Sequence, residues 1–289
     1  NDFLKDAIFN PYTWRCIMRI AHARKENMQQ IDEVHGGAGS ILFDRVFERE
    51  DFATDWSFIH AASLLPGGGI GHHRHEHCEE IFVTVDNAAQ FTHNGRTTEV
   101  VGPAAVPLRT GETHGIYNHT DRETRWYNFH VVLPGKGSDS TDLGDDRADA
   151  ELESAERLPV GRLDRKLLKY SRSHGGRGEI GAHMVWQSQD FRTNFGFLGL
   201  ALLPPDTSVG YHRHDTLEEC YIILQGSGRM TVDDETAEVF PGDVIPNRLG
   251  GSHGLYNHTH EELEILVVAV TQEKGKLDAT NLGDELAKR

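Results

Sequence analysis

The sequence is poor in cysteine and contains no long hydrophobic run. Only 3 of its 289 residues are cysteines, and they have no regular spacing and cannot all pair within the chain. This usage favours a reducing compartment over a secreted disulfide scaffold. The apolar runs are far shorter than the roughly 18 to 20 residues that a membrane-spanning helix needs. We therefore expect a soluble, cytoplasmic protein with no membrane partner.

Basic residues are also scarce. The chain has 29 Lys and Arg against 45 Asp and Glu, which gives a formal net charge of −16 at pH 7. A surface of this charge repels the phosphate backbone of nucleic acids, so we expect no nucleic-acid partner. The sequence also lacks the G-x-x-x-x-G-K-S/T loop that would indicate nucleotide binding.

The most informative feature of the sequence is a histidine pattern that occurs twice, at a constant offset that takes His73 to His212 and Glu80 to Glu219. Each copy has His-x-His, then a Glu, then a more distant His. The same offset relates the heptapeptides that begin at His114 and His253, which share six of seven residues. A duplicated module of roughly 95 residues explains these matches.

The repeat predicts two β-rich modules. In each copy, short runs of β-branched and aromatic residues alternate with turns rich in Gly, Pro and Asn, as in an all-β barrel or sandwich. We expect an N-terminal helical extension over 1–34, a first module over 35–134 and a second over 161–275. The acidic segment 135–160 is expected to be a solvated linker without site chemistry, and 276–289 a tail with a short helix.

The repeated residues are candidate metal ligands. Alternate side chains of a strand point to the same face, so both imidazoles of each His-x-His can face one ion. One His-x-His is a weak indication, but a complete set occurring twice in register predicts up to two divalent metal ions per chain. The candidate ligands are His73, His75, Glu80 and His114 in the first module, and His212, His214, Glu219 and His253 in the second.

These residues resemble the two motifs of the cupin superfamily, and their duplication resembles a bicupin. The matching positions of the second module are His212, His214, Glu219 and Gly226 for the first motif, and Gly250, His253 and Asn257 for the second. The first module has Asn87 where the closing Gly would stand, but Asn tolerates a left-handed backbone. The Pro-x-Gly of the later motif is not intact in either copy. The resemblance covers roughly residues 35–133 and 174–272, and it implies two tandem jelly-roll barrels, each with its metal inside.

Coordination chemistry narrows the function. Three imidazoles and one carboxylate fill the tetrahedral shell of Zn, whereas octahedral Fe(II), Mn(II) or Ni(II) keeps two open positions. We favour Fe(II), with Mn, Ni or Zn as alternatives, in a dioxygenase (an oxidoreductase) that chelates a small organic substrate without an organic cofactor. The alternatives are an O₂-independent isomerase, lyase or decarboxylase acting on a sugar acid or another oxygen-rich compound, and a non-catalytic binding or storage bicupin.

Several further positions bear on the site. Asn118 and Asn257 follow the last His of each set by four residues, so they could hydrogen-bond a ligand or form a turn. His35 and His174 begin Gly-rich stretches, which a turn before the first strand explains without site chemistry. A homodimer is compatible with the sequence, because exposed sheet edges and the N-terminal segment offer surfaces for it.

The two copies also diverge, so their sites need not be equivalent. The divergent positions are Trp126, Asn128 and His130 against Ile265, Val267 and Ala269, and His60 against Gly199. If these side chains face inward, the first module has the more polar pocket.

Overall fold

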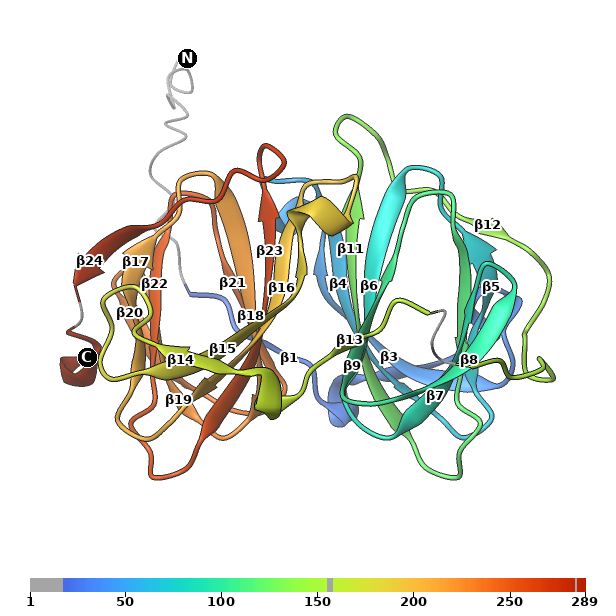
Figure 1. Ribbon diagram of the computed structural model, residues 1–289, viewed down its shortest axis with the longest axis horizontal. Coiled ribbons are helices and arrows are strands. Elements are labelled where there is room, and N and C mark those ends of the chain that lie inside the picture. Colours follow the sequence, from blue (N-terminus) through green and yellow to red (C-terminus); the bar gives the residue numbers. More distant parts are fainter. Residues whose placement is uncertain (1–17, 155–157, 284) are drawn as a thin grey trace, which may run out of the picture.

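The computed structural model describes residues 18–154, 158–283 and 285–289. Within these ranges two similar modules lie side by side, each built from a seven-stranded and a five-stranded sheet (Figure 1). All pairings between neighbouring strands of the described sheets are antiparallel.

The strands of the first module are given in their order across each sheet. Its larger sheet is β13 (Gly161–Arg162), β9 (Ala104–Leu108), β6 (Cys78–Thr84), β11 (Thr124–Val132), β4 (Trp56–Leu64), β3 (Ser40–Glu48) and β2 (Gln29–Asp32). Its smaller sheet is β12 (Thr141–Asp142), β5 (Gly69–Arg74), β10 (Thr113–Tyr117), β7 (Ala88–His93) and β8 (Arg96–Val101).

The second module repeats this arrangement. Its larger sheet is β1 (Ala21–His22), β21 (Asp243–Asn247), β18 (Leu217–Gln225), β23 (Leu263–Thr271), β16 (Phe195–Leu203), β15 (Ile180–Gln187) and β14 (Lys169–Ser171). Its smaller sheet is β20 (Glu235–Val239), β19 (Gly228–Val232), β22 (Ser252–Tyr256), β17 (Ser208–Arg213) and β24 (Thr280–Gly283). Short 3-10 helices connect strands in both modules: η1 (Lys25–Asn27), η2 (Val34–Gly36), η3 (Arg49–Asp51), η5 (Arg165–Leu167) and η6 (Ser188–Asp190). A further one, η7 (Leu286–Lys288), follows the last strand.

The double jelly-roll fold predicted from the sequence is confirmed, but each module is an open sandwich and not a closed barrel. Across the described strands, the hydrogen-bonded order of the larger sheet does not continue into the smaller one. The space between the sheets is filled by side chains, with Phe82, Phe91 and Trp126 in the first module and Met230 and Leu255 in the second. This interior is where the metal-ligand candidates lie.

A third core joins the modules, because their larger sheets pack against each other through their outer faces (Figure 1). Alternate residues of one strand serve both cores: Ile59 and Ala61 of β4 face the second module, whereas Ala62 and Leu64 face the interior of the first. Strands of this kind are apolar on both faces, as those in the middle of a layered structure must be.

Two buried carboxylates connect the modules reciprocally. Glu79 accepts hydrogen bonds from the backbone N–H of Arg192 and from the N–H and hydroxyl of Thr193, at 2.8, 2.7 and 2.7 Å. Glu218 accepts the equivalent bonds from Thr54 and from the backbone N–H of the preceding residue. The constant offset of the repeat relates donors and acceptors alike, so the two modules exchange the same contact.

The helical prediction for the N-terminal extension is wrong over the part that the structure describes, and residues 1–17 lie outside it. Residues 18–34 instead supply β1 to the edge of the second module and β2 to the edge of the first, with η1 between them. Without these segments β21 and β3 would be edge strands with unpaired backbone groups, which an extended segment satisfies better than a helix does. The predicted C-terminal helix is only the three-residue η7.

The acidic segment after the first module is largely exposed, as its composition predicts, but it is not merely a linker. Thr141 and Asp142 form β12, which pairs with β5 beside His73. Cys78 and Cys220 are buried free thiols, whereas Cys16 lies outside the described residues. Among the residues described, no helix is long and apolar enough to cross a lipid bilayer.

Candidate metal centres

The structure brings the eight predicted ligands together in two buried clusters. The first cluster is His73, His75, Glu80 and His114, and the second cluster is His212, His214, Glu219 and His253. Within each, the potential ligand atoms all lie within 4.8 Å of one another. The smaller sheet pairs His73 directly with His114 across β5 and β10, while Glu80 comes from β6 of the larger sheet. Each cluster therefore lies between the two sheets of its module.

Backbone carbonyls orient the two imidazoles of each His-x-His. The Nδ1 atom of His73 lies 2.8 Å from the carbonyl oxygen of Gly71, and Nδ1 of His75 contacts the carbonyl oxygen of Asp139. A carbonyl can only accept, so Nδ1 carries a proton and Nε2 is the atom that faces the cluster. The same bonds recur in the second module, from His212 to Gly210 and from His214 to Asp278.

The remaining atoms of the clusters fit a divalent cation. Nε2 of His114 lies 2.8 Å from Oε2 of Glu80, and Nε2 of His75 lies 3.4 Å from the same oxygen. In the second cluster the buried Nε2 of His212 has no hydrogen-bond partner among the described residues. A cation between these atoms would satisfy the carboxylate and the free lone pairs together, which explains why so many polar groups are buried in one place.

The electrostatics of the first cluster also favour a cation. Burial and the neighbouring His114 lower the pKa of His73 to about 2, so this imidazole is neutral. Burial opposes ionisation of Glu80, but its contacts with His75 and His114 outweigh it and hold the pKa of the carboxyl well below its ordinary value. Burial also acts to lower the pKa of His75, yet the charge of Glu80 raises it to about 9. A metal ion would take the place of the proton that Glu80 holds on His75.

Asp139 and Asp278 are site residues that the sequence interpretation missed. The carbonyl of Asp139 holds His75, and its carboxylate accepts hydrogen bonds from the N–H groups of Glu76 and His77 at 2.7 and 2.8 Å. The expectation of no site chemistry in the acidic segment was therefore wrong. The repeat carries the signal, because Asp139-Ser-Thr-Asp-Leu-Gly144 and Asp278-Ala-Thr-Asn-Leu-Gly283 are related by the same offset as the ligands.

His35 and His174 also lie at the clusters, although the sequence interpretation left them out. The ring of His35 stacks on His73 with centroids 4.1 Å apart, and that of His174 stacks on His212 at 3.7 Å. Both residues have a left-handed backbone, with φ of 52° and 49°. The turn that we expected is present, and its conformation places each ring against the first ligand of its cluster.

Asn118 and Asn257 stabilise turns and do not reach the ligands. The side-chain amide of Asn118 donates to the carbonyl oxygens of Leu64 and Arg122 at 2.8 and 2.7 Å, and its oxygen accepts from the N–H of Thr120. Asn257 makes the equivalent bonds. Asn87, which replaces the closing Gly of the motif, adopts a left-handed φ of 51° as its chemistry allows.

The divergent positions of the last large strand face inward, so the first module has the more polar interior. The side-chain amide of Asn128 donates to Oε1 of Glu80 at 2.7 Å. His130 is fully buried, and its ring lies 5.3 Å from that of His75. Burial lowers the pKa of His130 to about 4, so the ring is neutral. The equivalent Val267 and Ala269 provide no polar group.

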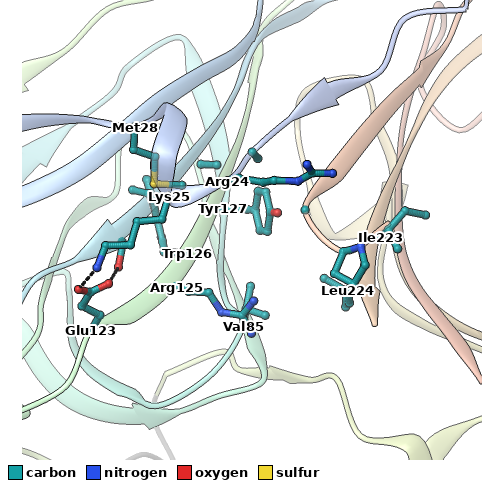
Figure 2. A pocket seen from close by; sticks show the side chains of 16 residues that line it. Arg24, Lys25, Met28, Val85, Glu123, Arg125, Trp126, Tyr127, Ile223 and Leu224 are labelled. Carbon is teal, nitrogen blue, oxygen red and sulfur yellow. Dashed lines mark hydrogen bonds and ion pairs between the residues drawn. The ribbon is translucent and has the colours of Figure 1, made fainter. Parts of the chain in front are cut away.

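A separate cavity of about 280 Å³ lies between the modules, beneath the N-terminal segment (Figure 2). The side chains labelled around it include Arg24, Lys25, Met28, Trp126, Tyr127, Ile223 and Leu224. None of the eight cluster residues lines this cavity, so it is distinct from the candidate metal centres.

The fold and the clusters together define a class of protein, namely duplicated jelly-roll proteins with a buried three-histidine, one-carboxylate cluster in each module. The sequence profile of the cupin domain family matches residues 199–269, within the second module. This match identifies a cupin domain in the second module, and the first module repeats its fold and its cluster, as the resemblance to a bicupin implies.

Comparison with individual proteins points to relatives that are named for oxalate. The chain is 29% identical over 102 residues to the oxalate-binding protein of Thermotoga maritima. The aligned region covers 35% of this chain and 84% of that protein. It is 39% identical over 69 residues to an uncharacterized protein of Methanocaldococcus jannaschii, which covers 24% of this chain and 55% of that protein.

A solved structure of oxalate decarboxylase from Bacillus subtilis has the same fold, with a TM-score of 0.62 at 16% identity over 91% of this chain and 78% of that chain. A structure from work on the Mn(II) centres of that enzyme has a TM-score of 0.59. At this level of identity the likeness concerns the fold alone.

Proposed function

We propose that this protein is a metal-dependent lyase that decarboxylates a small dicarboxylate of the oxalate type and consumes no O₂. The observation that carries the proposal is the pair of buried clusters, each combining one carboxylate with three imidazoles. Relatives named for oxalate support this O₂-independent alternative better than the Fe(II) dioxygenase that we favoured from the sequence.

We infer that Mn(II) is the preferred ion. The Mn(II) centres of the structurally similar decarboxylase support this choice over Fe(II), and an octahedral ion with four protein ligands keeps two positions for a chelating substrate. A bound ion would supply Lewis-acid stabilisation of negative charge on the substrate. The residues that would hold it are the three histidines and the glutamate of each cluster.

The surrounding residues prepare the site for this chemistry. In the second module the carbonyl groups of Gly210 and Asp278 hold the protons of His212 and His214 on Nδ1, so that both Nε2 atoms face the cluster, and the first module repeats these bonds. The apolar side chains between the two sheets of each module exclude water, which strengthens electrostatic interactions inside. In the overall reaction the C–C bond of oxalate breaks, one proton is taken up, and CO₂ and formate are released.

Product analysis tests the proposal. We expect the Mn(II)-loaded protein to convert oxalate into CO₂ and formate in equal amounts while O₂ is not consumed. A variant carrying both His73→Ala and His212→Ala is the control, and it should be inactive. Consumption of O₂ in proportion to turnover would instead support the dioxygenase hypothesis.

Binding of oxalate without turnover is the second candidate function, because the relative from Thermotoga maritima is named for oxalate binding. Calorimetry separates the two candidates. A binding protein would show saturable oxalate uptake by the Mn(II)-loaded chain, with no CO₂ or formate formed on prolonged incubation.

A further inference from the structure

The two candidate metal centres differ in the space that leads to them. In the second module a cavity of about 100 Å³ is lined by Glu219 of the cluster, by His174, and by residues on β15, β16 and β23. Its wall runs from Met184, which is 49% exposed, to Glu219, which is 5% exposed. This volume is well above the roughly 10–15 Å³ that a single water needs, so the cavity can hold a small organic anion.

Small residues create this cavity. Ala182 and Gly199 lie on β15 and β16 and line it, and Gly199 pairs in register with Met184 on one side and Val267 on the other. A Cβ atom built on Gly199 would lie 3.2 Å from Sδ of Met184, so a larger side chain here would intrude on the wall. The cavity therefore depends on the absence of a side chain at residue 199.

Rings occupy the equivalent positions of the first module. His60 stands at the position of Gly199, and Phe43 at that of Ala182. The rings of Phe43 and His60 lie 4.7 Å apart, Phe58 stacks on His60 at 3.6 Å, and His130 stacks on Phe58 at 4.4 Å. This ring stack (Phe43, His60, Phe58 and His130) ends 5.3 Å from the ring of the ligand His75. Phe58 has a counterpart in Phe197, which lines the second-module cavity, so the rings of Phe43, His60 and His130 are those that lie where the second module has open space.

We propose that small anionic substrates reach the metal centre of the second module only, and that the ring stack makes the first centre a closed, structural one. This inference rests on the proposed function for the identity of the substrate. His174 borders the route, because its ring lines the cavity and stacks on His212. A dicarboxylate in the cavity would meet the edge of this imidazole at one end and the cluster at the other. The more polar interior of the first module is thus a packed interior, not the substrate pocket.

Exchanging the residues between modules tests the inference. Gly199→His should leave two Mn(II) per chain but weaken oxalate binding at least tenfold in calorimetry. Ala182→Phe imitates the other half of the ring stack and should act in the same direction, which keeps the test decisive if Gly199→His does not fold. The matched control is the double variant Phe43→Ala with His60→Gly. It should preserve the original oxalate affinity and raise the number of oxalate ions bound per chain from one towards two.

The outcomes separate the inference from the proposed function. Two oxalate sites in the unmodified protein, or oxalate affinity unchanged within twofold in both Gly199→His and Ala182→Phe, would overturn the inference. If the unmodified protein binds no oxalate, the proposed substrate is wrong, and azide then serves as the probe of access. Azide should perturb the electron paramagnetic resonance signal of one of the two Mn(II) centres, and Gly199→His should abolish that change. A change at both centres would overturn the inference independently of any substrate.

Discussion

Replacing Glu79 with alanine should destabilise the contact between the modules by about 3–5 kcal/mol. Glu79 is 0% exposed and accepts bonds of 2.8, 2.7 and 2.7 Å from Arg192 and Thr193. A hydrogen bond to a charged group contributes about 1.5–3 kcal/mol, but the three bonds share one carboxylate and are not additive. Removing the carboxylate leaves two N–H groups and one hydroxyl without their acceptor. An unsatisfied buried donor costs about 1–3 kcal/mol, and incomplete additivity over the three gives an expected loss of about 3–5 kcal/mol.

Guanidinium unfolding monitored by tryptophan fluorescence measures this loss of unfolding free energy, because Trp56 and Trp126 are buried in two of the cores that unfolding exposes. Glu218→Ala should cost a similar amount, since its bonds are the reciprocal ones. The control is Glu99→Ala, whose carboxylate is largely exposed and pairs only with His119 among the described residues. It should change the free energy of unfolding by less than about 1 kcal/mol.

A loss below about 1 kcal/mol for Glu79→Ala would refute the reasoning, because it would mean that the N–H groups of Arg192 and Thr193 find other partners. The variant also tests how interface and site are linked. Glu79 and the candidate ligand Glu80 are neighbours on β6 and face opposite sides of the sheet. We therefore expect a weaker Mn(II) affinity in the first centre together with the lower stability.

Three further predictions concern the clusters. His73→Ala and His212→Ala should each reduce the metal content from two ions per chain to one, as counted by mass spectrometry. Glu80 raises the pKa of metal-free His75 to about 9, so Mn(II) must displace a proton from this residue when it binds. The affinity of the first centre for Mn(II) should therefore rise with pH up to about 9 and level off above it. Calorimetry in buffers of different ionisation enthalpy detects the released proton. Asn257→Ala should lower the free energy of unfolding by about 1–3 kcal/mol without changing the metal content, since its amide holds only a turn.

The double module and the eight clustered residues could be predicted because their signals are local or repeated. Strand alternation places His73 and His75 on one face whatever the rest of the chain does. The constant offset of the repeat then marks Glu80 and His114 as members of the same set. The same offset also relates Asp139 and His35 to their counterparts, but neither could be recognised as a site residue. Asp139 orients an imidazole through its backbone carbonyl, which any residue type could provide. His35 begins a Gly-rich stretch, which a turn explains without a role in the site.

The course of the N-terminal segment could not be predicted from its composition. Its helix-forming residues express a local preference of less than about 1 kcal/mol each, whereas sheet edges in both modules offer backbone hydrogen bonds to an extended chain. β1 pairs with β21, which is far away in the sequence, as Ala21 opposite Val244 shows, whereas β2 pairs with the nearby β3. Strand pairing therefore outweighed the local helix preference over residues 18–34.

The sequence by itself determined which side chains can bind metal, because ligand chemistry and strand periodicity are properties of the residues and their spacing. Only the tertiary structure decided which centre has room for a substrate. His60 and Gly199 occupy equivalent positions in the repeat, but whether a side chain there fills a cavity depends on what the opposite strands place beside it. Phe43 on β3 and His130 on β11 help to close the first interior, whereas Ala182 and Val267 line an open cavity in the second, since packing is set by neighbours in space and not by neighbours in the chain.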